Sequence, residues 1–256
     1  MKTPPLRQTD WIAGLEYGLQ VIESFNRDHD RMTISDVSRR TGLSRSAARR
    51  YLLTLVHLGY MAFDGKLFSL SPRILRVGWA YFDSVRLPRM LQPHLLQLSN
   101  QVGHACYISV LDDWHLVIIG RGDGARATSA GYVLGARIPA VLTSAGIMLL
   151  ALQKSRDEVV RWLAETTLAS HTAHTITDAD TLLRCIDDAR NLGYAVMEQQ
   201  LQLDVRGIAV PLRRWDGGVI AAINVNSSMN VEHLDTALQR TLPAMKACAN
   251  RAIELL

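Results

Sequence analysis

Apolar residues recur at helical spacing over residues 11–27 of the chain. They stand three or four positions apart, with Val21 beside them: Leu15, Leu19, Ile22 and Phe25. This period places the side chains on one face of a helix. We therefore expect an amphipathic helix that buries this face against the rest of the domain.

Two further helical patterns follow a polar turn. Thr33 stands where a helix N-cap is expected, before a helix over 34–41 that Gly42 would end. Ser44 is the expected N-cap of the next helix, which runs to Gly59. The apolar positions of this last helix share one face: Ala48, Leu52, Leu55 and Val56. Two short helices joined by a tight turn are typical of a helix-turn-helix.

The hydrophobic period changes beyond Gly59. Residues 60–70 alternate as two strands around Asp64-Gly65, a strong hairpin signal, and Pro72 and Pro88 each begin a helix. Strand-like and helical segments follow to the C-terminus: strands at 105–112, 115–122 and 131–139, a hairpin of two strands over 206–226, and helices at 143–153, 155–165, 178–192 and 231–255. The pattern predicts an α+β protein whose larger domain has an antiparallel sheet flanked by helices.

Bulk composition restricts the function classes. Of the 256 residues, 48% are hydrophobic and 20% charged, which is ordinary for a soluble globular protein. No apolar run reaches the roughly 18–20 residues of a membrane helix, and no signal peptide is evident, so a cytoplasmic protein with no membrane partner is expected. Cys106, Cys185 and Cys248 lack metal-ligand spacing, so neither a metal nor another cofactor is expected.

Positive charge is concentrated in the first third of the chain. Residues 1–87 hold 13 Lys and Arg against 8 Asp and Glu, whereas residues 88–256 hold 15 against 16. The imbalance favours a polyanionic partner for the N-terminal part. A solvated basic surface without a partner would give the same count, so charge alone leaves both interpretations open.

Five arginines and no acidic residue lie between positions 39 and 50. Arg45 and Arg49 are four positions apart and share one face of the third helix, opposite Leu52. Exposed arginines at this end of the helix are typical of a recognition helix in the major groove of double-stranded DNA. The predicted DNA-binding residues are Ser44, Arg45, Ser46, Arg49, Arg50, Arg39, Arg40 and, on the hairpin, Lys66. The alternative is a basic helical surface without a ligand.

The segment GLSRSAARRYLLTLVHLGYMAFDGKLFSLSPRILRVG resembles the winged-helix domain of IclR-type transcriptional regulators, closest to the branch that responds to protocatechuate and hydroxybenzoate. GARIPAVLTSAGIMLLA, GYAVMEQQLQLDVRGIAVPL and VIAAINV resemble the family's C-terminal segments, so the resemblance covers nearly the whole chain. It implies a winged helix-turn-helix over 1–71, a linker helix over 72–87 that dimerises, and a GAF-like effector-binding domain over 88–256. It also implies a homodimer or homotetramer that binds palindromic DNA and responds to a small organic acid, with aromatic acids favoured.

The resemblance also implies where the effector binds. The candidates lie in the P-x-x-x-TS-x-G segment and in the C-terminal signature: Arg137, Thr143, Ser144, Met197, Val205, Gly207, Asn224 and Asn226. The family usually has a polar residue at Met197, Ser or Cys at Gly207, and Gly at Asp204. These departures predict a wider and less polar pocket.

Other residues near the predicted sheet have two interpretations. Tyr107, Ser109 and Trp114 are placed to contact an aromatic ligand, or they belong to the sheet core and its turn. Arg126, Arg137 and Arg206 are suitable partners for a carboxylate, or they are ordinary surface and structural arginines.

Two rival functions follow from the same residues. Thr143-Ser144-Ala145-Gly146 would suit an anion site at a helix N-terminus, but it lacks the Gly-x-Ser-x-Gly elbow, and neither HExxH spacing nor a P-loop occurs elsewhere. We therefore do not expect an enzyme. The second rival is a DNA-binding protein whose C-terminal domain only oligomerises.

Overall fold

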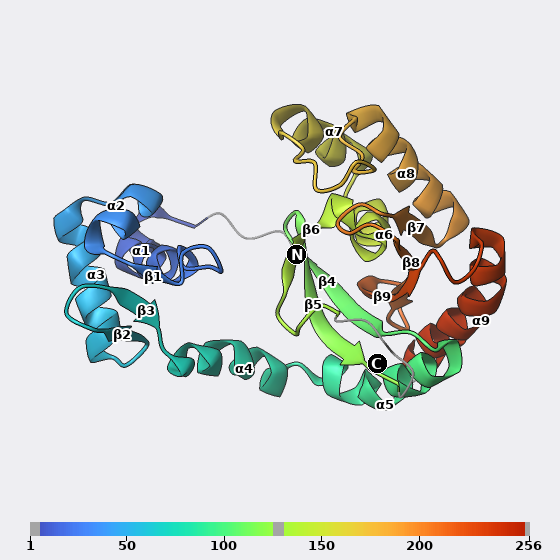
Figure 1. The fold of residues 1–256 in the computed structure, drawn as a ribbon, viewed down its shortest axis with the longest axis horizontal. Helices are drawn as coiled ribbons and strands as arrows, with labels where there is room; N and C mark the ends of the chain where they lie inside the picture. The colour runs from blue at the N-terminus through green and yellow to red at the C-terminus, as the bar shows by residue number, and fades with distance from the viewer. Residues whose placement is uncertain (1–5, 125–130, 254–256) are drawn as a thin grey trace. The chain divides into compact units, whose positions relative to one another are not determined.

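The computed structural model describes residues 6–124 and 131–253, which form two compact units with their boundary after Tyr81. Each unit is considered by itself. The boundary falls within the segment 72–87 that the sequence predicts as a linker. Figure 1 shows the chain coloured from its N-terminus to its C-terminus.

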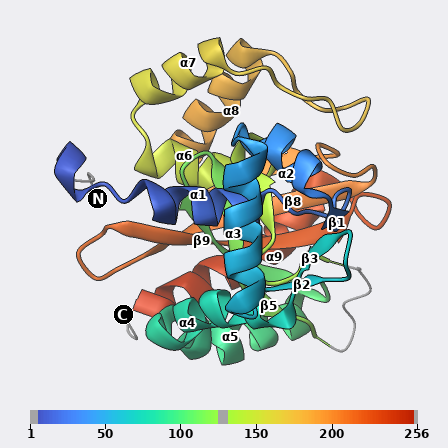
Figure 2. The same cartoon turned by 90° about the vertical axis from the view of Figure 1, so that its left-hand side faces the viewer.

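The first unit contains the helix-turn-helix (Figure 2). Its helices are α1 (Ala13–Glu23), α2 (Ile34–Thr41) and α3 (Arg45–His57), preceded by a 3-10 turn η1 (Gln8–Asp10). Its antiparallel strands, in the order β1-β3-β2, are β1 (Arg31–Met32), β2 (Met61–Phe63) and β3 (Phe68–Leu70). A 3-10 turn η2 (Pro72–Ile74) then leads into α4 (Leu75–Ser84).

Local capping explains where α2 and α3 begin. The Thr33 hydroxyl accepts a hydrogen bond from the backbone N–H of Asp36, and the Asp36 carboxylate accepts one from the Thr33 N–H, which completes a capping box. Ser44 accepts from the backbone N–H of Ala47, and Gly42 takes the left-handed conformation after α2. The predicted helix starts are therefore confirmed.

The predicted buried face of α1 is wrong in part. Leu15 is 62% exposed and Leu19 is 48% exposed, whereas Val21 is fully buried and Phe25 is nearly so. Residues 11–17 are all exposed, so only the end of α1 and the residues after it pack into the core of the unit. That core consists of Val21, Met32, Val37, Ala48, Leu52 and Phe68, among others.

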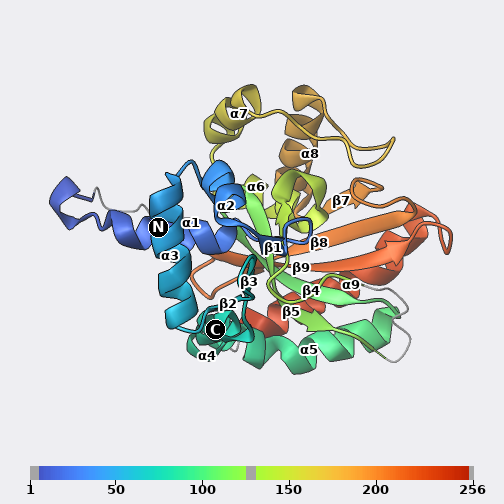
Figure 3. The same cartoon turned by 60° about the vertical axis from the view of Figure 1, so that its left-hand side comes forward.

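The second unit is built on a six-stranded antiparallel sheet of order β6-β5-β4-β9-β8-β7 (Figure 3). The strands are β4 (Cys106–Asp112), β5 (His115–Gly122), β6 (Arg137–Pro139), β7 (Ala195–Glu198), β8 (Val205–Arg213) and β9 (Val219–Ser228). The helices are α5 (Arg86–Val102), α6 (Ser144–Gln153), α7 (Arg156–Glu165), α8 (Ala179–Leu192) and α9 (Leu234–Ile253). The predicted α+β class, with helices flanking an antiparallel sheet, is confirmed.

Two of the sequence boundaries that differ from the structure have a local explanation. The strand predicted over 131–139 is limited to the last three residues, because Gly135 adopts a left-handed turn conformation just before it. The helix predicted to begin at Pro88 begins at Arg86, which places the proline in the first turn, where no helical N–H partner is required.

The sheet separates two hydrophobic cores. Alternate residues such as Ile108, Val210 and Ile223 face α5 and α9, whereas their neighbours Ala209 and Ala222 face α6 and α8. This period-two alternation along buried strands explains how one sheet supports helices on both faces. Figure 1 shows α5 and α9 on one side of the strands and α6 and α8 on the other.

The helix α6 packs unusually close to its surroundings. Every residue from Ser144 to Ala151 is buried, and Thr143 caps the helix by accepting from the N–H of Gly146 at 3.0 Å. The α carbon of Gly146 lies directly against the carbonyl of Ala140 in the 3-10 turn η3 (Ala140–Leu142). Glycine is required because any side chain would fill this contact.

Replacing Gly146 with alanine is therefore expected to destabilise the second unit. A Cβ would lie 2.1 Å from the Ala140 oxygen, so η3 or α6 must move. We expect the free energy of unfolding to fall by about 1–3 kcal/mol in urea denaturation. The control is Gly18→Ala in α1, where a Cβ meets nothing within 4 Å, and alanine should be neutral or stabilising. Equal losses in both variants would contradict this account.

Candidate DNA-binding surface and effector cavity

The N-terminal end of α3 presents a basic surface. Arg45, Arg49 and Arg50 are exposed and form no ion pair or side-chain hydrogen bond with the described part of the chain. Ser44 and Ser46 are also exposed, and their hydroxyl oxygens lie 3.1 Å apart. Three arginines thus remain available to an external anion, next to the two serines at the helix N-terminus.

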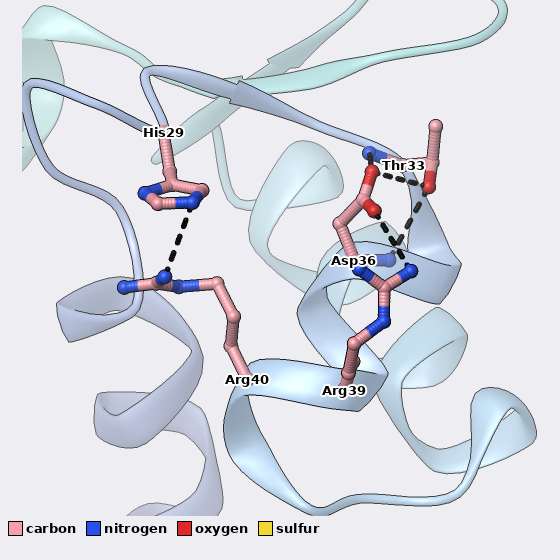
Figure 4. A network of polar contacts seen from close by, with 5 residues as sticks. All are labelled: His29, Thr33, Asp36, Arg39 and Arg40. Carbon is pink, nitrogen blue, oxygen red and sulfur yellow. Dashed lines mark hydrogen bonds and ion pairs between the residues drawn. The ribbon is translucent and has the colours of Figure 1, made fainter.

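Two of the predicted DNA-binding arginines are held by the protein itself (Figure 4). The Arg40 Nε donates to the backbone carbonyl of Ser24 at 3.0 Å, and its Nη1 lies 3.3 Å from Nε2 of His29. Arg39 forms an exposed ion pair with Asp36 at 3.3 Å. Hydrogen bonds from Thr33 lower the pKa of Asp36, so its carboxylate stays charged beside Arg39. Arg40 therefore links α2 to the segment after α1.

The hairpin places Lys66 at an exposed turn. The Asp64 carboxylate accepts hydrogen bonds from the backbone N–H groups of Lys66 and Leu67, and it also pairs with Arg31 of β1. These backbone hydrogen bonds lower the pKa of Asp64. The carboxylate thus fixes the turn and neutralises Arg31, whereas the Lys66 side chain extends into solvent.

The structure brings most of the predicted effector residues to one cavity of about 40 Å³. It lies between the start of α6 and the sheet, and its predicted lining residues are Thr143, Ser144, Met197, Val205, Gly207, Asn224 and Asn226. Strand register explains the grouping: Gly207 stands opposite both Met197 of β7 and Asn226 of β9. Asn224 lies two residues from Asn226 and therefore on the same face of the sheet.

An adjoining cavity of about 180 Å³ shares part of the same wall. The residues common to both are Tyr132, Gln202, Val205 and Asn226. Tyr107, predicted as an aromatic contact, lines this second space. Ser109 lies deeper, fully buried, and its hydroxyl donates to the Asn224 side chain at 3.4 Å.

Of the three predicted arginines, the two within the described residues do not line either cavity. Arg137 lies on the edge strand β6, is half exposed, and pairs with Asp112 at 3.4 Å. Arg206 is almost fully buried, pairs with Glu198 at 2.6 Å and donates to the backbone carbonyl of Glu232, so its role is structural. Arg126 lies outside the described residues.

Gly207 does not open the cavity as the sequence predicts. A Cβ at this position would lie 2.7 Å from the Ser144 Oγ, so the serine occupies the space that glycine leaves. Ser144 is only 2% exposed, and its hydroxyl forms no hydrogen bond within the described part of the chain. Because Ser144 lines the cavity, its hydroxyl is available to a polar ligand group.

Sequence reasoning missed the loop after β7, whose residues Gln200, Leu201 and Gln202 also line the first cavity. The side-chain nitrogen of Gln200 donates to the carbonyls of His174 and Glu198, and its oxygen accepts from the N–H of Ile176. Gln200 therefore supports the loop. No hydrophobic period marks such a loop, and the strand β7 that it follows was not predicted either.

Comparison with known proteins decides the family. The model for the IclR helix-turn-helix domain matches residues 14–65, and the model for the bacterial transcriptional regulator IclR C-terminal domain matches residues 79–253. The chain belongs to the IclR family of transcriptional regulators. The resemblance inferred from the sequence is confirmed, and the protein is a helix-turn-helix DNA-binding regulator.

Individual relatives cover nearly the whole chain. A p-hydroxybenzoate hydroxylase transcriptional activator from Acinetobacter baylyi is 36% identical over 96% of this chain and 92% of its own length. A crystal structure of a transcriptional regulator from Rhodococcus sp. RHA1 is 36% identical, with a TM-score of 0.77 over 95% of this chain and 98% of that chain.

A third comparison concerns the C-terminal part. The inducer-binding domain of the PobR transcription factor from Acinetobacter, a double mutant in complex with 3-hydroxybenzoic acid, is 30% identical over 67% of this chain and the whole of that chain, with a TM-score of 0.62.

Within the described residues, no helix of this protein is long and apolar enough to cross a membrane.

Replacing an internally bonded arginine and replacing an exposed, unpaired arginine should have different effects on the stability of α2. Arg40→Ala is expected to weaken α2 by about 1 kcal/mol, because its bonds to Ser24 and His29 are lost. Hydrogen–deuterium exchange of peptides covering α2 in the full-length protein would report this loss as faster exchange. Arg49→Ala, which removes no internal contact, should leave exchange unchanged. Equal protection in both variants would show that Arg40 does not anchor the helix.

Proposed function

We propose that the protein binds a palindromic DNA operator as a dimer or a pair of dimers, and that an aromatic carboxylic acid in the cavity beside α6 controls this binding. The observation that carries the proposal is the Ser144 side chain, which lines a cavity at the N-terminus of α6 and forms no hydrogen bond within the described residues. Relatives named for p-hydroxybenzoate hydroxylase and for a 3-hydroxybenzoic acid complex support an aromatic acid.

The unpaired arginines of α3 support the DNA-binding part of the proposal. Arg45, Arg49 and Arg50 are exposed at the end of the helix that carries the Ser44 cap. Guanidinium groups donate two parallel hydrogen bonds to guanine and also neutralise phosphates. Lys66 on the hairpin would contact the DNA backbone beside the groove. Arg40 has a supporting role, because its side chain holds α2 to Ser24, whereas Arg39 stays largely exposed and can still contact the DNA backbone.

The exposed face of α1 supports self-association. A groove of about 560 Å³ runs along this helix from Leu6 to Glu23; five apolar residues line it together with Asp10, Glu16, Gln20 and Glu23. The members that are more than half exposed are Leu6, Trp11, Ile12 and Leu15. Large contiguous apolar patches on a soluble protein mark interaction sites. A second copy of the same surface would cover this face and produce the two-fold symmetry that a palindromic operator requires.

Uncharged donors would hold the ligand carboxylate. No Lys, Arg or His is present in the described lining of the 40 Å³ cavity, which instead combines Thr143, Ser144, Asn224 and Asn226 with the start of α6. A helix N-terminus supplies partial positive charge and unpaired N–H groups to an anion. The 40 Å³ space is too small for a ring, but the adjoining 180 Å³ space exceeds the roughly 150 Å³ of a known benzene-binding cavity.

Ligand control requires two states of different ligand affinity. The acid would shift the population of domain arrangements only as far as it binds one of them more tightly. The protein acts as a cytoplasmic regulator without catalysis in this scheme. If the C-terminal domain only oligomerises, no acid would stabilise it, and the ligand test below separates the two cases.

Binding-site selection from a random DNA library should yield an inverted repeat. We expect half-sites separated by one or more helical turns of about 34 Å each, because a symmetric dimer presents two α3 helices. Arg49→Ala should weaken binding to the selected site about tenfold or more in fluorescence anisotropy. Arg137→Ala, which removes an exposed arginine of the other unit, should not. An asymmetric site, or unchanged affinity of Arg49→Ala, would overturn this prediction.

A panel of acids should raise the melting temperature of the full-length protein selectively. We expect 3- and 4-hydroxybenzoate and protocatechuate to stabilise it, and short-chain acids to do so less. Ser144→Ala should weaken acid binding about tenfold in calorimetry, which corresponds to one hydrogen bond to a charged group. Arg137→Ala, the arginine outside the cavity, should keep wild-type affinity. No stabilisation by any acid would favour a C-terminal domain that only oligomerises.

A further inference from the structure

A third cavity of the second unit lies apart from the two described above. Its volume is about 190 Å³, and it is enclosed by β6, the 3-10 turn η3, α7 and the segment that follows α7. The residues that define its character are Trp114, Trp162, Val141, Leu142 and Leu168, and its mouth is bordered by Ala169. This space is larger than the roughly 150 Å³ cavity that accommodates benzene.

The wall of this cavity is aromatic and nearly uncharged. The rings of Trp114 and Trp162 stack at 4.6 Å between centroids and 11° between planes. Lys154 lies over the Trp114 ring at 4.8 Å and pairs with Asp113 at 3.9 Å, so the nearest charges balance each other. Burial and the charge of Arg137 lower the pKa of His115, one of the two histidines of the wall, which keeps it neutral. The buried Nδ1 of His115 has no hydrogen-bond partner within the described residues. A mostly apolar space with a few polar groups is typical of a small-molecule site.

One wall residue is shared with the cavity beside α6. Leu142 lines both spaces and is 7% exposed. It directly precedes Thr143, the N-cap of α6, and the buried Ser144. A ligand in the aromatic cavity therefore contacts Leu142, and Leu142 directly precedes the two residues that form the polar wall of the cavity beside α6.

A second connection runs through the segment after α7. Residues 166–169 and His171 line the aromatic cavity, and the chain continues at once to Thr172. The Thr172 hydroxyl donates to the carbonyl of Gln199 at 2.5 Å, and the Thr175 hydroxyl donates to that of Gln200 at 2.7 Å. Gln200 lines the cavity beside α6. The aromatic cavity thus shares a wall residue with the cavity beside α6, and it also borders the segment that supports the loop of Gln200.

We propose that the cavity between Trp114, Trp162 and Leu142 is a second ligand site, which takes an uncharged single-ring aromatic compound. The stacked indoles and aliphatic side chains provide apolar contact on several sides, and the described wall has no Lys or Arg to bind a carboxylate. Its occupancy changes the affinity of the cavity beside α6, because both spaces share Leu142 and the segment 166–176 joins the aromatic cavity to Gln200. This coupling rests on the proposed function, whereas the site itself does not.

Ligand-observed fluorine NMR of the full-length protein tests the site with 4-fluorophenol as the probe. We expect broadening of the probe signal with wild-type protein and its loss in Ala169→Phe, where an exposed residue at the mouth gains a ring that fills the cavity. Ala164→Phe, an exposed alanine of α7 that does not line the cavity, should bind like wild type. Gly207→Val, which blocks the cavity beside α6, should also retain probe binding.

Other outcomes overturn the proposal. The site is absent if 4-fluorophenol does not bind, or if Gly207→Val abolishes binding while Ala169→Phe retains it, since the probe then occupies the effector cavity. Charged 4-fluorobenzoate should not compete with the probe in Gly207→Val, and competition would contradict the assigned ligand class.

Calorimetry tests the coupling. The dissociation constant of 4-hydroxybenzoate should change at least threefold when 4-fluorophenol saturates wild-type protein, and it should not change in Ala169→Phe. An unchanged constant in wild type would show that the two sites are independent. If 4-hydroxybenzoate does not bind at all, the proposed effector fails, and the NMR result with the variants still decides the second site.

Discussion

The close approach of α6 to its neighbours is the constraint on which the second unit depends. Gly146 lets the helix lie directly against the carbonyl of Ala140, and the sheet beneath it presents small residues such as Ala209, Ala222 and Gly207. Larger side chains at Ala209 or Ala222 would lift the helix from the sheet. Because the helix is close, its N-terminus becomes the wall of a cavity instead of a solvent-exposed end. The polar chemistry of that cavity therefore follows from packing between small residues.

In the first unit, the exposed arginines likewise depend on internal contacts that fix the helices carrying them. Its arginines are close together in sequence, but they separate into two groups by their contacts. The Arg40 side chain forms hydrogen bonds with Ser24 and His29, whereas the side chains of Arg45 and Arg49 form no hydrogen bond within the described residues. Orientation of the exposed arginines depends on α2 and α3 being fixed to each other. The internally bonded arginine thus contributes to recognition through the position of the helices.

Features determined by neighbouring residues could be predicted from the sequence, and those determined by long-range packing could not. Thr33, Ser44 and Thr143 are caps whose bonds span three residues, so their pattern is visible in the chain. Leu15 has the right spacing for a buried face, but spacing does not reveal that nothing in its unit covers it.

The cavity was predictable to a similar extent. Its strand and helix residues, among them Ser144 and Asn226, follow from the resemblance to the family and from strand register. Gln200 was missed because its role depends on contacts with His174 and Ile176, more than twenty residues away. The position of Arg137 on the outer edge of the sheet likewise depends on strand order, which the sequence alone does not reveal.

The contact between Ser144 and Gly207 has a consequence for how the cavity is tuned to its ligand. The resemblance to the family indicates Ser at position 144 together with Ser or Cys at position 207, whereas here the strand has only a hydrogen atom at position 207. A Cβ added at Gly207 would lie 2.7 Å from the Ser144 Oγ, so a side chain on the strand requires the serine hydroxyl to turn away. The residue at position 207 would therefore set the direction of the Ser144 hydroxyl without touching the ligand itself.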